Sequence, residues 1–459
     1  MTSLDTTPAP PKERRSKGRW IDHWEPEDET FWMTTGRRVA TRNLIFSIFA
    51  EHLGFSVWLL WSVVVVSLPA AGFEFSIDQL FWLVAVPNLV GSTLRLPYTF
   101  AVPKFGGRNW TVVSALLLVI PTTLLVIAVS NPATPFWVFL LVAATAGFGG
   151  GNFASSMTNI SFFFPERSKG LGLGLNAAGG NLGTSVVQFG VPMVVGIGGG
   201  LTLAYAGLMW LPLIAAAAVC AWVFMDNLTV SKAPVRGQLG AAKRPHTWVM
   251  SFLYIGTFGS FVGYTAAYPL LAKTVFPESS ALKYAFLGAM LGSLIRPIGG
   301  WLADRWGGAR VTFGVFVVMV GGMLLLLVAV NTHSIGLFMG AFAVLFGASG
   351  VGNGSTYRMI PAIFRTQGEQ EERAGVPHAV KTALTEAGAA IGIISAIGAF
   401  GGFLIPRAYG MSLASTGSVA TAVIAYAVFY AVCVAVTWWF YMRRQLLVSM
   451  APSLASASV

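Results

Sequence analysis

Two arginines stand in the middle of long apolar stretches, Arg95 in LVGSTLRLPY and Arg296 in AMLGSLIRPIGG. A guanidinium keeps its charge at any accessible pH, so burying one at the depth of a lipid bilayer is costly unless a counter-charge balances it. Both arginines follow the same Gly-Ser-x-x lead. Two guanidiniums in matching contexts predict a site that binds an anion.

The composition indicates that these stretches cross a membrane. Of 459 residues, 55% are hydrophobic and 10% are charged, and the mean hydropathy is +0.69. Soluble domains carry about 25% charged residues, so we expect an all-α polytopic membrane protein. With about 20 apolar residues per span, the sequence predicts roughly twelve spans. They are 42–67, 79–101, 109–130, 135–163, 171–196, 202–225, 248–273, 281–303, 309–330, 335–364, 379–405 and 418–442.

Lysine and arginine are concentrated in alternate loops between the predicted spans. Cytoplasmic loops of membrane proteins carry an excess of these residues, so the basic side is expected to be cytoplasmic and to hold both termini. We therefore expect a multi-pass protein of a prokaryotic cytoplasmic membrane. The basic residues on this side are Arg37, Arg38, Arg42, Lys104, Arg108, Arg167, Lys169, Lys232, Arg236, Lys243, Arg244, Arg305, Arg310, Arg365, Arg373, Arg443 and Arg444.

The two halves of the chain repeat one pattern. An offset of 201 residues pairs Arg95 with Arg296, and the glycine of the following turn, Gly106, with Gly307. Parallel repetition of six spans is the organisation expected of a major facilitator fold with 12 transmembrane helices. The expected divisions are an N-terminal tail (1–41), two six-helix bundles (42–226 and 248–444), a linker (227–247) and a C-terminal tail (445–459).

The depth of the arginines follows from helix geometry. Arg95 lies ten residues before Phe105 and Arg296 ten before Trp306, at the start of each turn. At a rise of 1.5 Å per residue, both lie about 15 Å from the cytoplasmic edge, which is roughly the bilayer midplane. The repeat then predicts that they face each other across the cleft between the halves.

Acidic residues inside the spans are the next candidates for chemistry. Glu51 and His52 lie together in the first span, and Glu386 lies in the eleventh. Buried ionisable groups of this kind are candidates for carrying protons. The alternative is that Glu51 and Glu386 are structural counter-ions.

The turn GGWLADRWGGAR (299–310) resembles the loop signature of major facilitators. Asp304 in it could pair with a basic group when the cytoplasmic side is closed, which would make Asp304, Arg305 and Arg310 gating residues. A tight charged turn with no gating role is the alternative. Arg358, near the end of the tenth span, is expected to reach the interface, with a gating ion pair as the other option.

Several other chemistries find no support in the sequence. Cys220 and Cys433 fall inside spans and the five histidines are scattered, so no metal site or cofactor is expected. No nucleophile constellation suggests an enzyme. The net charge of +11 lies in loops facing anionic lipid, which explains it without nucleic acid. The hydrophilic tail is too short to be the output domain of a sensor.

Longer motifs resemble the nitrate/nitrite porter family of the major facilitator superfamily, and its NarK-type bacterial members in particular. The motifs cover both halves of the chain: GNFASSMTNISFFFPERSKG, GLGLNAAGGNLG, GNGSTYRMIPAIF, ISAIGAFGGFLIP and the tail element WEPEDETFW.

This resemblance implies transport of nitrate and nitrite through a site walled by aromatic rings. The implied site residues are Arg95, Arg296, Asn176, Phe148, Tyr254 and Tyr357. Both anions are planar, which suits paired guanidinium hydrogen bonds and ring stacking. The expected partners are these anions, protons and lipid, and the protein is expected to be monomeric.

The mode of coupling is left open by the sequence. Moving one negative charge into the cell costs about 2.3 kcal/mol per 100 mV. Exchange of nitrate for nitrite removes this cost, whereas symport with more than one proton reverses it and needs a titrating group. Some exchangers of the family lack acids in the path, so Glu51 and Glu386 favour proton-coupled nitrate import. Electroneutral exchange is the alternative, and an anion channel is a more distant one.

Overall fold

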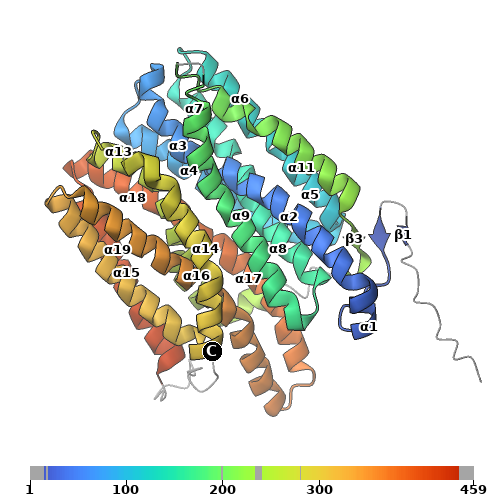
Figure 1. Ribbon diagram of the computed structural model, residues 1–459. Helices are drawn as coiled ribbons and strands as arrows, with labels where there is room; N and C mark the ends of the chain where they lie inside the picture. The colour runs from blue at the N-terminus through green and yellow to red at the C-terminus, as the bar shows by residue number, and fades with distance from the viewer. Residues whose placement is uncertain (1–14, 17–18, 198–199, 233–239, 280, 444–459) are drawn as a thin grey trace, which may run out of the picture.

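The computed structural model describes residues 15–16, 19–197, 200–232, 240–279 and 281–443. It is built almost entirely from long helices arranged in two groups, an N-terminal half in blue to green and a C-terminal half in yellow to red (Figure 1). Within the described residues, eleven helices are long and apolar enough to cross a membrane. The protein is therefore an all-α membrane protein, as the composition predicted.

Each half is formed by six helices or bent helix pairs. The N-terminal half contains α2 (Arg37–Trp58) with α3 (Trp61–Ser67), α4 (Ile77–Phe105), α5 (Gly107–Leu117) with α6 (Val119–Ser130), α7 (Phe136–Thr145) with α8 (Gly147–Phe163), α9 (Glu166–Val194), and α10 (Tyr205–Leu208) with α11 (Trp210–Phe224). The C-terminal half contains α12 (Pro245–Tyr254), η5 (Ile255–Gly259) and α13 (Ser260–Val275), then α14 (Ala285–Trp306), α15 (Gly308–Asn331), α16 (Ile335–Arg373), α17 (Ala379–Ala399) with α18 (Gly401–Thr416), and α19 (Ala420–Thr437).

Helix α9 corresponds to the predicted span 171–196. It is the one predicted span that is not among the eleven strongly apolar helices. It has 29 residues, enough to cross a bilayer, but its sequence is rich in glycine and polar amides. It packs against α2 within its own half and against α14 of the other half. Because protein surrounds much of it, it does not need the apolar composition of a lipid-facing helix.

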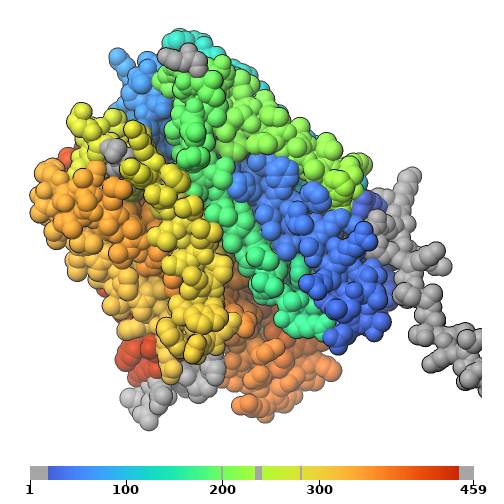
Figure 2. Space-filling view, viewed as in Figure 1, coloured from blue at the N-terminus to red at the C-terminus, as the bar shows by residue number. Residues whose placement is uncertain are grey.

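The halves meet through equivalent helices. Helix α4 packs against α17 and α18, and its repeat partner α14 packs against α9. In Figures 1 and 2 the green α9 and the yellow α14 run side by side along the seam between the halves. The turns after α4 and α14 also match, because Gly106 and Gly307 have φ values of 88° and 89°, a region that favours glycine.

Helix α4, which carries Arg95, has clear start and stop signals. At its N-terminus Ser76 and Gln79 form a capping box, in which each side chain bonds the other residue's backbone N–H at 3.3 and 2.9 Å. At its C-terminus Gly106 adopts the positive φ that ends the helix. These signals fix the position of Arg95 along the bundle axis.

Some helices run further than the hydrophobic pattern predicts. The first span begins at Glu29 and the tenth continues to Arg373, where the sequence predicts 42 and 364. The added turns contain charged residues, which end an apolar pattern but do not end a helix. The predicted C-terminal tail, 445–459, lies outside the described residues, as does part of the predicted linker, 233–239.

The N-terminal segment docks against one end of its own half. Strand β2 (Trp20–Ile21) pairs in parallel with β3 (Asn227–Leu228), at the start of the linker. Trp24 and Trp32 are buried in a small apolar cluster with Phe163. We call this end of the molecule, where Gly106 lies against Asn227, the linker end.

Candidate anion-binding site

Arg95 is completely buried, at the place where the halves meet. Its Nε donates to the Gly150 carbonyl of α8 at 3.1 Å, and its Nη1 donates to the Ser395 carbonyl of α17 at 3.2 Å. Helix α8 can approach this closely because Gly91 has no Cβ. A Cβ there would lie only 3.1 Å from the Cα of Gly150. The remaining nitrogen, Nη2, is buried without a hydrogen-bond partner.

Arg296 comes from the repeat-related helix α14 and is 5% exposed. Its Nη1 is likewise buried without a hydrogen-bond partner. Among the described residues, neither arginine forms an ion pair with a carboxylate. Each guanidinium therefore has one buried nitrogen whose N–H groups find no acceptor in the described protein. This is costly unless a ligand supplies the acceptor.

A single aromatic ring brings the two arginines together. The guanidinium carbon of Arg95 lies 4.6 Å from the centroid of the Phe153 ring, and that of Arg296 lies 5.7 Å from it. Arg95 also lies 4.7 Å from the Phe258 ring, and Arg296 lies 5.4 Å from the Tyr357 ring. Both arginines therefore contact the same side chain, although they come from different halves.

The aromatic wall extends from this ring into the C-terminal half. Phe153 stacks on Phe258 at 5.7 Å, and Phe258 stacks on Tyr254 at 5.3 Å. The Tyr254 hydroxyl donates to Asn353 Oδ1 at 2.8 Å, which fixes the ring. Of the aromatics predicted to line the site, Tyr254 joins this stack and Tyr357 lies beside Arg296.

Phe148, the third predicted aromatic, is placed differently. It is half-buried on α8, five residues before Phe153. At about 100° per residue, five residues turn a side chain to roughly the opposite side of a helix. Phe153 and Phe258 are not among the residues predicted from sequence, although Phe153 belongs to the same GNFASS run that supports the family resemblance.

Asn176 and Glu51 are brought into direct contact. Asn176 Nδ2 donates to Glu51 Oε2 at 2.6 Å, and the Ser156 hydroxyl donates to the same oxygen at 2.5 Å. Ser156 is itself bonded to Ser47 at 2.8 Å. All four side chains are buried. The amide expected to bind the anion and the acid expected to carry the proton are therefore neighbours.

The buried charges of this region do not cancel. Glu51 interacts electrostatically with both Arg95 and Arg296. With Glu51 ionised, two positive charges face one negative charge, and a single monovalent anion would balance the site. Within the described residues there is no cluster of three or more metal-ligating side chains.

The other two proton candidates have different surroundings. His52 Nδ1 lies 3.0 Å from the Gly179 carbonyl, which can only accept, so this nitrogen is the donor. Glu386 accepts from Arg244 Nε at 2.5 Å, and Arg244 also bonds Glu371 at 2.7 Å. Glu386 is therefore held in an ion-pair cluster, which corresponds to the structural alternative raised for it.

The predicted gating residues lie at the linker end. Asp304 pairs with Arg358 of α16, and both side chains are more than half exposed. Because α14 and α16 belong to the same half, this pair does not join the halves. Arg305 lies 5.7 Å from the Trp301 ring, and Arg310 is exposed.

The hydrogen bonds between the halves are concentrated away from the linker end. Besides the bond from Arg95 at mid-depth, Ser185 donates to the Phe286 carbonyl at 2.9 Å and Gln188 donates to the Thr265 carbonyl at 2.7 Å. Arg407 of α18 donates to Asp78 of α4 at 2.9 Å.

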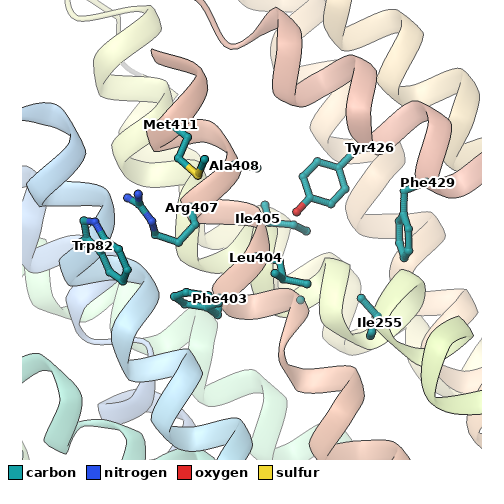
Figure 3. A pocket seen from close by; sticks show the side chains of 11 residues that line it. Trp82, Ile255, Phe403, Leu404, Ile405, Arg407, Ala408, Met411, Tyr426 and Phe429 are labelled. Carbon is teal, nitrogen blue, oxygen red and sulfur yellow. The ribbon is translucent and has the colours of Figure 1, made fainter. Parts of the chain in front are cut away.

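Arg407 is held by an aromatic ring as well as by this acid. Its guanidinium lies 4.0 Å from the ring of Trp82. Figure 3 shows the two side chains next to each other at one side of an apolar cavity of about 520 Å³.

The linker end is more open between the halves. A polar cavity of about 730 Å³ is lined there by Glu166 of the N-terminal half and by Asp304, Arg358 and Arg365 of the C-terminal half. In the parts of the chain that the structure describes, no hydrogen bond joins the halves on this side of Arg95.

Comparison with known proteins agrees with this architecture. Residues 52–376 match the family model of the Major Facilitator Superfamily. The chain is 44% identical over 448 residues to the nitrate/nitrite transporter NarU of Escherichia coli (strain K12), covering 92% of this chain and 96% of that protein. This chain belongs to the nitrate/nitrite porter family of the major facilitator superfamily.

Two further proteins are similar to this nitrate/nitrite porter, one in sequence and one in fold. It is 37% identical to a Thermus thermophilus protein named "Probable nitrate/nitrite antiporter NarK2", covering 94% of this chain and 98% of that one. A bacterial homologue of the human lysosomal transporter Spinster, solved inward-facing and occupied, has a TM-score of 0.60 with 16% identity, covering 86% of this chain and 95% of that one. The second likeness supports the fold alone.

Proposed function

We propose that this porter carries nitrate and nitrite across the cytoplasmic membrane by alternating access. The observation that carries the proposal is the pair of unpartnered guanidinium nitrogens, Arg95 Nη2 and Arg296 Nη1, beside the shared ring of Phe153. A small planar anion accepts hydrogen bonds in its plane and stacks on a ring through its face, so both features serve one ligand.

The relatives' names support the choice of anion. NarU is named a nitrate/nitrite transporter and is similar over nearly the whole of both chains. The site residues Arg95, Arg296, Asn176, Tyr254 and Tyr357 are proposed on this basis, and Phe153 is added to them by its contacts with both arginines.

The conformation of the molecule supports alternating access. The contacts between Asp78 and Arg407 and around Gln188 close the end of the cleft opposite the linker. The polar cavity at the linker end would offer the anion a route to that side of the membrane. With the termini in the cytoplasm, as the basic loops predict, this arrangement is inward-facing, and binding of the anion would lower the repulsion that opposes closure of the halves.

Proton-coupled import is the mode of transport we favour. Glu51 is buried, bonded to Asn176 and within electrostatic range of both arginines. A proton on this carboxylate would change the charge of the site directly. Glu386 is less suited to the role, because its carboxylate is committed to Arg244.

Electroneutral exchange of nitrate for nitrite is the second candidate. It is favoured by the name of the Thermus thermophilus relative, an antiporter. Exchange needs no titrating group, so under this mechanism Glu51 would only offset part of the arginine charge.

One experiment separates the two modes. Nitrate uptake is measured in proteoliposomes with an inward proton gradient, and separately with nitrite preloaded inside. For import with protons, the gradient drives uptake by the wild type, Glu51→Gln loses that drive and keeps exchange, and Glu386→Gln, the matched control, behaves as the wild type. If only preloaded nitrite drives uptake, and Glu51→Gln is unaffected, the protein is an exchanger. Absence of nitrate flux under both conditions would contradict the proposed function.

A further inference from the structure

The side chain of Asn176 satisfies its hydrogen bonds on one side only. Its Nδ2 donates to Glu51 Oε2 and lies 2.6 Å from Ser156 Oγ, whereas its Oδ1 is buried without a partner. The second oxygen of Glu51, Oε1, is also buried without a partner. Two side chains in direct contact therefore each keep one buried acceptor without a donor, and a proton on Glu51 Oε2 would give the carboxyl a donor to offer to the amide oxygen.

The orientation of this amide is dictated by the charge of Glu51. An ionised carboxylate can only accept hydrogen bonds, so the amide must present its nitrogen, as it does here. A protonated carboxyl carries an O–H donor, and the best partner for a donor is the amide oxygen. Rotation of the amide by about 180° about its last side-chain bond exchanges the two ends without moving helix α9.

We propose that Asn176 is a proton-operated switch, whose amide turns when Glu51 takes up a proton and then offers its N–H groups to the bound anion. This proposal rests on the anion site proposed above and explains how a proton on Glu51 would promote anion binding. In the ionised state the N–H donors of Asn176 are occupied by Glu51 and Ser156. In the protonated state the oxygen faces the Glu51 hydroxyl, and the nitrogen occupies the place of the unpartnered Oδ1.

The remaining groups around Glu51 hold their charge while it titrates. The guanidiniums of Arg95 on α4 and Arg296 on α14 act on it electrostatically and stay charged. Tyr357 on α16 is also within electrostatic range, and its phenol is neutral near pH 7. His52, the next residue on α2, donates its Nδ1 proton to the Gly179 carbonyl.

The neutral neighbours of Glu51 tolerate the rotation. Ser156 is held by Ser47 at 2.8 Å, and its hydroxyl hydrogen can rotate to serve the amide oxygen or the carboxyl. A Cβ on Gly180 of α9 would clash with the Glu51 side chain, so a glycine keeps α9 close enough for Asn176 to reach the acid. The parts that must move are one amide and one hydroxyl hydrogen.

The switch must be distinguished from the simple effect of charge. Protonation of Glu51 strengthens anion binding electrostatically whether or not the amide turns, because it removes a negative charge from the site. The switch adds a hydrogen bond from an amide to an anion, which corresponds to about tenfold in affinity. Only this additional part depends on Asn176.

The test is the dissociation constant of nitrate for the purified full-length protein, measured calorimetrically across the range in which Glu51 titrates. For wild type we expect affinity to fall as pH rises. Glu51→Gln, whose amide donates to Asn176 Oδ1 as the protonated acid does, should bind with the low-pH affinity at every pH. Asn176→Ala should retain only the electrostatic part, so its ratio of affinities between low and high pH should be about tenfold smaller than that of wild type.

Two further variants provide a matched control and a substitute for Asn176→Ala. Asn181→Ala, which removes another buried amide of α9, is the matched control and should keep the wild-type ratio. Asn176→Ser retains a group that donates and accepts without turning, so it should also show the reduced ratio and serves if the alanine variant does not fold. If both Asn176 variants keep the full wild-type ratio, the switch is overturned while anion binding stands. If wild type binds no nitrate at any pH, the proposed function itself is wrong.

Discussion

The Arg407 guanidinium donates to the Asp78 carboxylate at 2.9 Å, and this bond joins helix α18 of one half to helix α4 of the other. Arg407 is only 12% exposed and also lies over the Trp82 ring. The pair lies at the closed end of the cleft, so it must separate if that end opens during transport.

Reversing one charge of this pair should therefore slow transport. We expect Asp78→Lys or Arg407→Glu to place like charges across the halves and disfavour the inward-facing state, which lowers nitrate flux about tenfold. The combined variant, Asp78→Lys with Arg407→Glu, should recover part of the flux because opposite charges face each other again. A loss in the combined variant equal to the product of the two single losses would show that the residues act separately. The measurement is flux in proteoliposomes at matched protein content.

Lysine should not replace the arginines of the anion site. Arg95→Lys and Arg296→Lys keep the charge but lose the planar fork that can bond an anion and a carbonyl together. We expect each to lower the nitrate affinity at least tenfold while the protein still reaches the membrane. Arg310→Lys, at an exposed arginine of the C-terminal half, is the control and should bind as wild type. Near-normal binding by Arg95→Lys would argue against paired hydrogen bonds.

Phe153 should matter more than Phe148, although the two residues share a helix. Phe153→Leu removes the ring that both guanidiniums contact, and each such contact contributes about 0.5 to 2 kcal/mol. We expect nitrate affinity to fall about tenfold. Phe148→Leu changes a half-buried ring of the same size and should change affinity less than twofold. Binding calorimetry on the two variants checks this directly, and the reverse order would support Phe148, the residue named from sequence, as the wall of the site.

Asp226 should stabilise the N-terminal half. It is fully buried and accepts hydrogen bonds from Arg19, Arg42 and Asn43. Removing one partner from a buried ion pair costs about 3 to 5 kcal/mol, so Asp226→Asn should lower the Tm and expose the docked N-terminal segment to protease.

The control for Asp226 is Asp304→Asn, which breaks the exposed pair with Arg358 and should cost about 1 kcal/mol or less. Thermal unfolding and limited proteolysis measure both variants. A similar change of Tm in the two would mean that the Asp226 cluster does not hold the tail.

The sequence by itself determined the membrane architecture and singled out the two arginines of the proposed anion site. An apolar segment must be long enough to cross a bilayer whatever it packs against, so hydropathy located the spans. The same reasoning identified Arg95 and Arg296, because a guanidinium in an apolar span is conspicuous without knowledge of its neighbours. The repeat offset then related the two arginines and the turns at Gly106 and Gly307, whose matching backbone angles agree with it.

Only the tertiary structure decided which side chains meet. Sequence treated Glu51 and Glu386 as equivalent candidates, but Glu51 lies against Asn176 and Glu386 against Arg244. Sequence named Phe148 as a wall residue, whereas the ring that contacts both arginines is that of Phe153, because packing sets the rotation of a helix about its axis. The Asp78–Arg407 pair joins residues 329 positions apart. Hydropathy is a property of each segment, whereas partners across such distances depend on how all the helices pack together.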